Sequence, residues 1–327
     1  MGPEGCVVTQ DLPAGLLSVH APGDGEVWIT GASPEPADGT GPVVLRGTPE
    51  GWERYDTSAW AGAEIWWAHV TSSEAVLVGT DGLILELDRA TGTIEAVPGV
   101  PEGLTFFGVW GATAGDVWAV GQTDRGQGAP VLWRREGGTW AAYAGGDDAQ
   151  RESGTYFKVH GTSASDVWVV GSEGVALHFD GAAWALVPTD ADTPTATSPL
   201  LTVNTGGPRP MAVGGTGVGL LLEYDGEAWR NRTPDFQPGL NGVCARGATA
   251  WAVGVFGSRS VREEGDEGAW RSDSDLDLLP AINDDWHACA VTEDGDVWMV
   301  GGRIASRPLI RGVGGYVGAG EPLPITL

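Results

Sequence analysis

One phrase recurs along the whole of this 327-residue chain. Its fullest copy, residues 166–171, reads Asp-Val-Trp-Val-Val-Gly, and residues 175–184 add a second apolar run, an Asp-Gly turn and a tryptophan. Weaker copies of the first half recur along the chain and end in Gly31, Gly79, Gly121, Gly214, Gly254 and Gly301. Successive glycines lie about 40 to 50 residues apart, which is the repeat length of a β-propeller blade.

Each repeat is predicted to form four antiparallel strands. In the fourth repeat these are residues 156–161, 167–171 and 175–179, and a last strand that begins at Trp184 after the Asp180-Gly181 hairpin turn. The inner strands of the other repeats are expected to start near Leu16, Ile65, Phe106, Leu200, Leu240 and Trp286. The sequence therefore predicts an all-β fold: one seven-bladed β-propeller domain over residues 1–327, with four-stranded antiparallel blades.

An apolar stretch, residues 6–9, precedes the first repeat. We interpret it as the outermost strand of the seventh blade, supplied by the N-terminus, because such a closure joins the two chain ends and removes an exposed sheet edge. The alternative is that Tyr316 and Val317 complete that blade locally. The last repeat is expected to become irregular after Arg311.

Charge and composition exclude several classes of function. The chain has 44 acidic and 18 basic residues and a formal net charge of −26, which argues against binding to nucleic acid or to an anionic membrane surface. No apolar run approaches the roughly 18 residues of a membrane span, and the first ten residues lack the features of a signal peptide. Three cysteines cannot all pair internally, so a fold built on disulfides is not expected. We expect a monomer.

The longest predicted connections between strands fall on one face of the disc. In antiparallel blades, the connections between second and third strands share a face with those between successive blades. The insertions at these places are residues 32–42, 122–130, 144–155, 188–199 and 272–285. Because function concentrates on loops that a rigid scaffold holds, this face is the candidate working surface. The alternative is that these loops are long because their lengths are unconstrained and have drifted, with no function.

The phrase at residues 161–171, with residues 178–181 and Trp184, resembles a tandem propeller repeat of secreted or surface proteins in myxobacteria and related bacteria. It is distantly similar to Asp-box (BNR-like) repeats, whose hairpins carry an acidic residue, a glycine and a tryptophan. The resemblance implies a propeller in an extracytoplasmic location: periplasmic, cell-surface or secreted. It implies no catalytic residue, because the shared positions are architectural.

Four of the five histidines fall on predicted inner strands. Thiolate and imidazole ligands suit copper or zinc, and such ligands on consecutive blades would form an arc of His20, His69, Cys244, His287 and Cys289. Two structural interpretations compete with this arc. His20 and His160 share a repeat position with Trp110, which indicates packing, and Cys244 could pair with Cys289 in a disulfide between neighbouring inner strands.

A second group of residues departs from the repeat where the inner strands begin. Aromatic rings and carboxylates around a channel mouth suit stacking on a sugar or holding a cationic peptide group. The alternative is that the aromatic side chains fill the spaces between blades. Lys158 is the only lysine of the chain. The candidate ligand-binding residues are Trp66, Tyr156, Lys158, Asp284, Asp285, Trp286 and His287.

Alternating carboxylates at residues 273–277 could bind Ca²⁺, but the glycine and the closing glutamate of an EF-hand are absent. We interpret this segment, and the acidic pairs at residues 147–148 and 263–264, as solvated loops. The sequence requires no cofactor, although a divalent metal (calcium, copper or zinc) would be compatible with these residues.

No nucleophile elbow or phosphate-binding loop occurs in the sequence. Glu64 and Asp285 could serve a glycosidase as a carboxylate pair, but nothing in the sequence selects them. We therefore expect a non-catalytic extracytoplasmic binding module whose loop-rich acidic face meets a glycan or a protein partner. The alternatives are a glycan-active hydrolase or lyase at the channel mouth, and a copper- or zinc-binding protein that uses the Cys/His arc.

Overall fold

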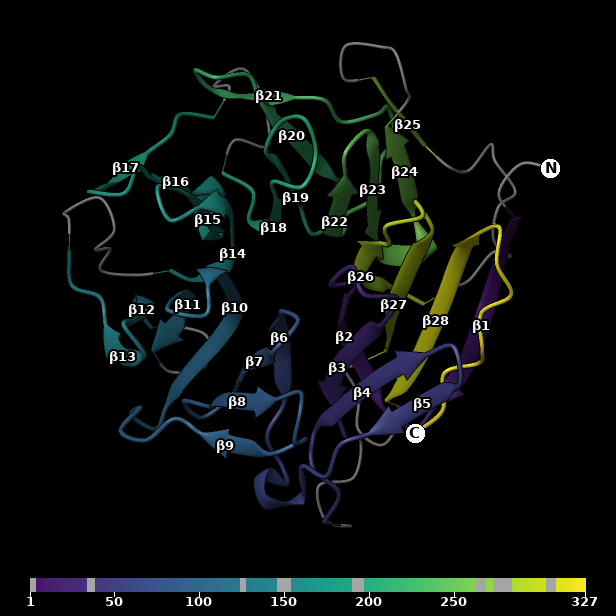
Figure 1. The fold of residues 1–327 in the computed structure, drawn as a ribbon. Helices are drawn as coiled ribbons and strands as arrows, with labels where there is room; N and C mark the ends of the chain where they lie inside the picture. Colours follow the sequence, from purple (N-terminus) through teal and green to yellow (C-terminus); the bar gives the residue numbers. More distant parts are fainter. Residues whose placement is uncertain are drawn as a thin grey trace.

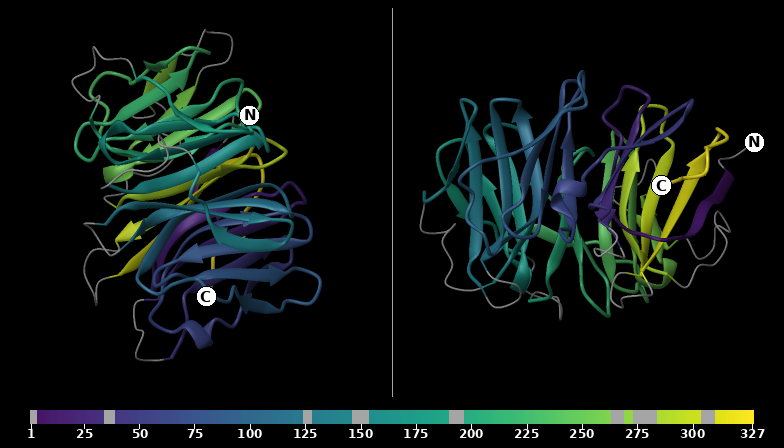
Figure 2. Two further views of the ribbon diagram at one scale, coloured as in Figure 1. Left: turned by 90° about the vertical axis from the view of Figure 1, so that its left-hand side faces the viewer. Right: turned by 90° about the horizontal axis from the view of Figure 1, so that it is seen from below.

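The computed structural model contains seven four-stranded antiparallel sheets, arranged as blades around a central axis (Figure 1). Seen from the side, the blades form a disc, and the inner strands run along its axis (Figure 2). The structure describes residues 4–33, 39–123, 128–145, 154–189, 197–262, 269–272, 284–303 and 310–327. The predicted all-β seven-bladed propeller is confirmed.

The first three blades have the following strands, from the axis outward. The first contains β2 (Gly15–His20), β3 (Val27–Ala32), β4 (Val43–Thr48) and β5 (Gly51–Arg54). The second contains β6 (Ile65–Val70), β7 (Glu74–Gly79), β8 (Ile84–Asp88) and β9 (Ile94–Ala96). The third contains β10 (Leu104–Thr113), β11 (Asp116–Thr123), β12 (Pro130–Glu136) and β13 (Thr139–Ala142).

The next three blades repeat this order. The fourth contains β14 (Tyr156–Ser163), β15 (Asp166–Gly171), β16 (Ala176–Phe179) and β17 (Trp184–Leu186). The fifth contains β18 (Leu200–Asn204), β19 (Met211–Gly214), β20 (Leu220–Tyr224) and β21 (Trp229–Asn231). The sixth contains β22 (Leu240–Arg246), β23 (Thr249–Gly254), β24 (Arg259–Arg262) and β25 (Trp270–Ser272). Short 3-10 turns occur at η2 (Ser58–Trp60), η4 (Ser172–Gly174) and η5 (Val255–Gly257).

The seventh blade joins the two ends of the chain. From the axis outward, its first three strands are β26 (Trp286–Val291), β27 (Val297–Arg303) and β28 (Arg311–Gly318). Its outermost strand is β1 (Glu4–Leu12) from the N-terminus (Figure 1). The predicted closure is therefore confirmed. The expectation of irregularity after Arg311 is wrong: the glycine-rich run there is a regular strand, because it is paired with β27 on one side and β1 on the other.

The recurring glycine lies at or near the end of the second strand of each blade, where the inner strand approaches it closely. A Cβ atom on Gly171 would lie 2.2 Å from the carbonyl oxygen of Thr155, and the equivalent distances at the other six glycines are 1.9–2.0 Å. Opposite this glycine every inner strand has a register shift, in which one extra residue is inserted. The repeated glycine thus marks a β-bulge in each blade.

Apolar side chains pack mainly between adjacent blades. In one such core, Trp118 of the third blade packs with Phe179 and Trp184 of the fourth, with ring centroids 5.2 Å apart in both pairs. Trp168 of the fourth blade likewise packs against Trp229 of the fifth. The tryptophans of the repeat therefore join blades into a ring, and the inner strands are left to line the channel.

Candidate functional site

The central channel contains two cavities. The first, which we call the mouth cavity, has a volume of about 360 Å³ and lies at the face of the disc where the inner strands begin. The second, which we call the histidine chamber, has a volume of about 330 Å³ and extends toward the face where the inner strands end; His20, His69 and His160 are among its lining residues. Trp67 and Lys158 line both cavities, so they form the layer between them.

The bulge of each inner strand supplies one side chain to the mouth cavity. A bulge leaves its extra residue outside the ladder and redirects the side chain, and here all seven extra residues line the same cavity. The first five blades contribute apolar or aromatic side chains, and the last two contribute an amide and an imidazole. In blade order, the seven bulge residues are Leu17, Trp66, Phe107, Phe157, Leu201, Asn241 and His287.

Three aromatic bulge residues form a continuous wall. The rings of Trp66 and Phe107 are 5.2 Å apart with an interplanar angle of 75°, and those of Phe107 and Phe157 are 5.8 Å apart at 60°. All three side chains are half-buried. Because each ring meets the edge of its neighbour, the wall is a concave apolar surface.

The opposite side of the mouth cavity is polar. The Asn241 amide nitrogen donates to the Trp286 carbonyl oxygen (2.8 Å), and His287 Nδ1 donates to the carbonyl oxygen of Leu16 (2.7 Å). Burial lowers the pKa of His287. The Asp285 carboxylate also lines the cavity and accepts a hydrogen bond from the backbone N–H of Phe256 (2.9 Å). The cavity thus combines an apolar wall with one carboxylate.

Lys158 lies in the floor of the mouth cavity. Its ammonium donates to the Phe107 carbonyl oxygen (2.6 Å) and lies 4.2 Å from the centre of the Trp67 ring. Burial lowers the pKa of Lys158 to about 7. Within the described part of the chain, no carboxylate lies within ion-pair distance of this ammonium, so a carbonyl and an aromatic face are its polar contacts.

The structure brings together four of the seven predicted ligand-binding residues: Trp66, Lys158, Asp285 and His287 all line the mouth cavity. Tyr156 and Trp286 instead pack in interblade cores, with exposed fractions of 1% and 0%. Each occupies the position before its bulge, from which a side chain points between blades. Their predicted contact with a ligand is therefore wrong.

Asp284 forms an ion pair with Arg303 (2.8 Å) and does not line the cavity. The proposed carboxylate pair is not assembled either, because Asp285 is the sole carboxylate among the described residues that line the cavity and Glu64 is not one of them. Sequence reasoning missed five of the seven bulge residues: Leu17, Phe107, Phe157, Leu201 and Asn241. The signal for them was positional: each follows the residue that pairs with the recurring glycine.

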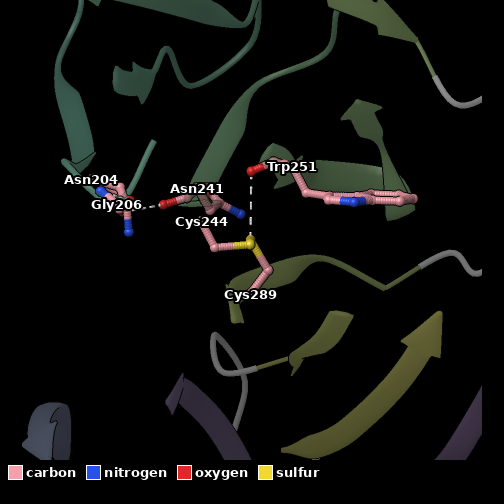
Figure 3. The surroundings of a disulfide bond; sticks show 7 residues. Asn204, Gly206, Asn241, Cys244, Trp251 and Cys289 are labelled. Atoms are coloured by element: carbon pink, nitrogen blue, oxygen red, sulfur yellow. Dashed lines mark hydrogen bonds between the residues drawn. A yellow bond between two sulfur atoms is a disulfide. The ribbon is translucent and has the colours of Figure 1, made fainter. Parts of the chain in front are cut away.

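The Cys/His arc is replaced by a disulfide. Cys244 and Cys289 are joined between β22 and β26, with their Cα atoms 5.6 Å apart (Figure 3). Both thiols are thereby removed as metal ligands, which makes the copper or zinc arc wrong. In the residues that the structure describes, no three His, Cys, Asp or Glu side chains are grouped to hold a metal ion. The acidic segments 147–148, 263–264 and 273–277, considered for calcium, lie outside the described residues.

Two exposed phenylalanines lie on the mouth face. Phe236 precedes β22 and is fully exposed, and Phe256 lies in the turn after β23 with 76% of its surface exposed. Both have left-handed backbone conformations, with φ of 58° and 55°. In the second and fourth blades, the turn that corresponds to that of Phe256 has an acidic residue in this conformation, Asp81 or Glu173. An aromatic residue at a strained, solvated position has no role in the packing of the blades.

No protein-family model and no curated protein matches the chain. Three solved structures similar to the chain are propellers. The WD40 repeats of RRP9 align with a TM-score of 0.70 at 9% identity, over 97% of this chain and 99% of that one. YCF48 bound to D1 peptide aligns with a TM-score of 0.65 at 14% identity, over 96% and 94%. YCF48 from Cyanidioschyzon merolae gives 0.65 at 13%, over 96% and 99%.

These similarities establish the propeller fold. The finer resemblance to myxobacterial-type or Asp-box repeats is not confirmed, because no family model matches. In the described residues, no helix has the length and apolar character needed to cross a bilayer.

Proposed function

We propose that this propeller is a non-catalytic interaction module whose mouth cavity receives a segment of a protein partner. The proposal rests mainly on the seven bulge residues, whose side chains come from seven separate strands and line one cavity. Five consecutive blades place an apolar bulge residue in this cavity. The packing between blades does not require apolar residues at these positions. A cavity of about 360 Å³ has the size of small-molecule and side-chain binding pockets.

The exposed phenylalanines support a protein rather than a glycan as the partner. Exposed apolar side chains on one face are typical of protein interaction sites, and Phe256 is connected to the cavity through its hydrogen bond to Asp285. The aromatic wall presents ring edges and tilted faces, whereas sugar stacking requires an open flat ring. A propeller of this architecture, YCF48, has been solved with a D1 peptide bound.

The carboxylate of Asp285 indicates which charge the partner segment carries. It lies on the wall opposite the apolar bulge residues, and the whole chain carries a net charge of −26. We therefore propose a partner segment that inserts an apolar side chain and carries a lysine or arginine next to it. Opposite charge accelerates such an encounter and selects the register in which it binds.

We further propose an extracytoplasmic location and a monomeric state. The Cys244–Cys289 disulfide supports the location, because disulfides persist in oxidising compartments and are rare in the cytosol. Light scattering tests the monomeric state, because it measures the molar mass of the protein in solution.

The test is selection of a random peptide library on the purified protein, followed by affinity measurement of the enriched peptides. Trp66→Ala and Phe157→Ala each remove a central aromatic contact and are expected to weaken binding about 30-fold or more. Leu186→Ala is the matched control, because this exposed side chain lies on the outer strand β17, away from the channel. Peptides that bind both aromatic variants as tightly as the wild type would refute the mouth cavity as the site.

A further inference from the structure

The histidine chamber has an unusual charge for this protein. Three imidazoles and the Lys158 ammonium line it, and the Arg246 guanidinium lies among its lining residues. Among the described residues that line the chamber there is no aspartate or glutamate, although the chain has a net charge of −26. The chamber is thus a cationic and hydrogen-bond-donating cavity inside an acidic molecule.

Hydroxyl groups hold two of the three imidazoles in place. Nε2 of His20 contacts the Ser18 hydroxyl (3.0 Å), and Nδ1 of His160 contacts the Thr205 hydroxyl (2.8 Å). The Ser18 hydroxyl can accept as well as donate, so its contact with His20 survives protonation of the ring. His160 Nδ1 also accepts from the backbone N–H of Thr205 (3.3 Å), so the proton of the neutral His160 ring is on Nε2, which can donate. Nε2 of His69 is buried and has no hydrogen-bond partner in the described part of the structure. It lies 3.2 Å from the position that a Cβ atom on Gly111 of the neighbouring inner strand would occupy, so it faces protein and not the chamber.

Neighbouring charged groups do not neutralise the chamber. Arg246 donates to the carbonyl oxygens of Val291 (3.2 Å) and Ala21 (3.0 Å), and its nearest carboxylate, Glu293, is 3.8 Å away and largely exposed. Arg135, which lies behind His69, is held by Glu74 and Glu86 and is therefore compensated. Among the residues that the structure describes, Lys158 has no carboxylate partner.

We infer that the histidine chamber is a binding site for a small oxyanion, a carboxylate or a phosphate, with Lys158 as its principal charge and His20 and His160 as its hydrogen-bond donors. A metal ion is not favoured, because no three of the described ligand-type side chains are grouped closely enough to hold one. An oxyanion has several acceptor oxygens, and it can contact donors on separated strands of a cavity of about 330 Å³.

The anion is expected to bind together with protons. Burial lowers the pKa of Lys158 to about 7, those of His69 and His160 to about 4, and that of His20 to about 3, so these four groups are mostly neutral above pH 7 when the chamber is empty. An anion stabilises the protonated forms and therefore raises these pKa values. Its affinity should fall about tenfold per pH unit above pH 7 and should change less steeply below, where Lys158 is already charged.

Titration calorimetry with sulfate, and separately with succinate, at pH 6.0 and pH 8.5 and low ionic strength tests the inference. Sulfate keeps its charge over this range, so a change in its affinity reports on the protein. We expect binding at pH 6.0 that is at least tenfold weaker at pH 8.5. Proton uptake on binding should be detectable at pH 8.5, where the free Lys158 is mostly neutral, in buffers of different ionisation heat. Preference for sulfate indicates phosphate as the natural chemistry, and preference for succinate indicates a carboxylate.

Lys158→Met should abolish this binding, whereas Arg311→Met, which removes one exposed positive charge that pairs with Asp11, should not. Because Lys158 is the only lysine, selective isotope labelling gives a single side-chain ammonium signal in the NMR spectrum of the unaltered protein. Absence of both heat and signal shift at pH 6.0, or sulfate binding by Lys158→Met equal to that of the wild type, would overturn the inference. Trp66→Ala should leave sulfate binding intact, so the test is independent of peptide binding at the mouth.

Discussion

Replacement of Lys158 by methionine should stabilise the protein, and by an amount that depends on pH. The ammonium is buried, its pKa falls from the ordinary 10.5 to about 7, and burial is the cause. Between pH 7 and pH 10.5 the unfolded chain binds one more proton at this side chain than the folded chain does, so the stability of the wild type rises with pH. Methionine fills a similar volume and does not titrate, so it removes this dependence.

The magnitude follows from the difference between the two pKa values. A difference of this size corresponds to about 5 kcal/mol, fully expressed below pH 7. Lys158→Met should therefore be more stable than the wild type by about 5 kcal/mol at pH 6 and by about 2 kcal/mol at pH 9. Differences in packing add an offset that does not vary with pH, so the decisive quantity is the change of about 3 kcal/mol between these two conditions.

Urea unfolding of both proteins, followed by tryptophan fluorescence in buffers without sulfate or phosphate, measures this quantity. Because every other titrating group is common to the two proteins, the difference between them isolates Lys158. A gap that stays constant from pH 6 to pH 9 would mean that the ammonium is solvated, and the reasoning would fail. Addition of sulfate at pH 6 should stabilise the wild type but not the variant, which connects this measurement to the proposed anion site.

Three further predictions concern the scaffold. Loss of the Cys244–Cys289 disulfide, in a Cys244→Ser/Cys289→Ser variant, should lower the free energy of unfolding by up to about 4 kcal/mol for a 45-residue loop, measured by urea unfolding; an unchanged midpoint would contradict a stabilising crosslink. Gly171→Ala should cost about 2 kcal/mol or more, because the new methyl group meets the Thr155 carbonyl, whereas Gly217→Ala has no heavy atom within 4 Å and should be nearly neutral in thermal unfolding. Deletion of residues 1–12 removes β1 and exposes the edge of β28, so light scattering should detect association that Cys6→Ser does not cause.

The fold could be predicted because its determinants are local and repeated. The glycine at the end of each second strand is required by the close approach of the inner strand, and a requirement that recurs in every blade leaves a periodic signal. The seventh blade was the difficult case. Residues 311–318 are rich in glycine, and they form a strand because they pair with β27 on one side and, on the other, with β1, about 300 residues away in sequence.

The site could be predicted only in part, because a one-residue shift decides which way a side chain points. Tyr156 and Trp286 looked like channel residues because they begin inner strands, but each precedes the bulge and points between blades. Phe157 and His287, the next residues, line the mouth cavity. The hydrophobic pattern of a strand does not reveal the extra residue of a bulge. The prediction therefore directed Tyr156 and Trp286 into the channel, although the residues after them are the ones that point there.

The bulge explains how one repeat can be both invariant in architecture and variable in function. In each blade the residue before the bulge is held in a core, and the recurring glycine opposite it cannot change without a clash. The bulge residue itself has no partner in the ladder, so its identity is free to differ from blade to blade: leucine, tryptophan, phenylalanine, asparagine or histidine. The scaffold therefore concentrates its permitted variation at seven adjacent points around one channel. Substitutions at Asn241 and His287 should also cost stability, because their side chains donate to carbonyl oxygens of the neighbouring blades. Substitutions at the other five positions should alter the choice of partner while changing stability little, and this is the property expected of an interaction module whose specificity is separate from its fold.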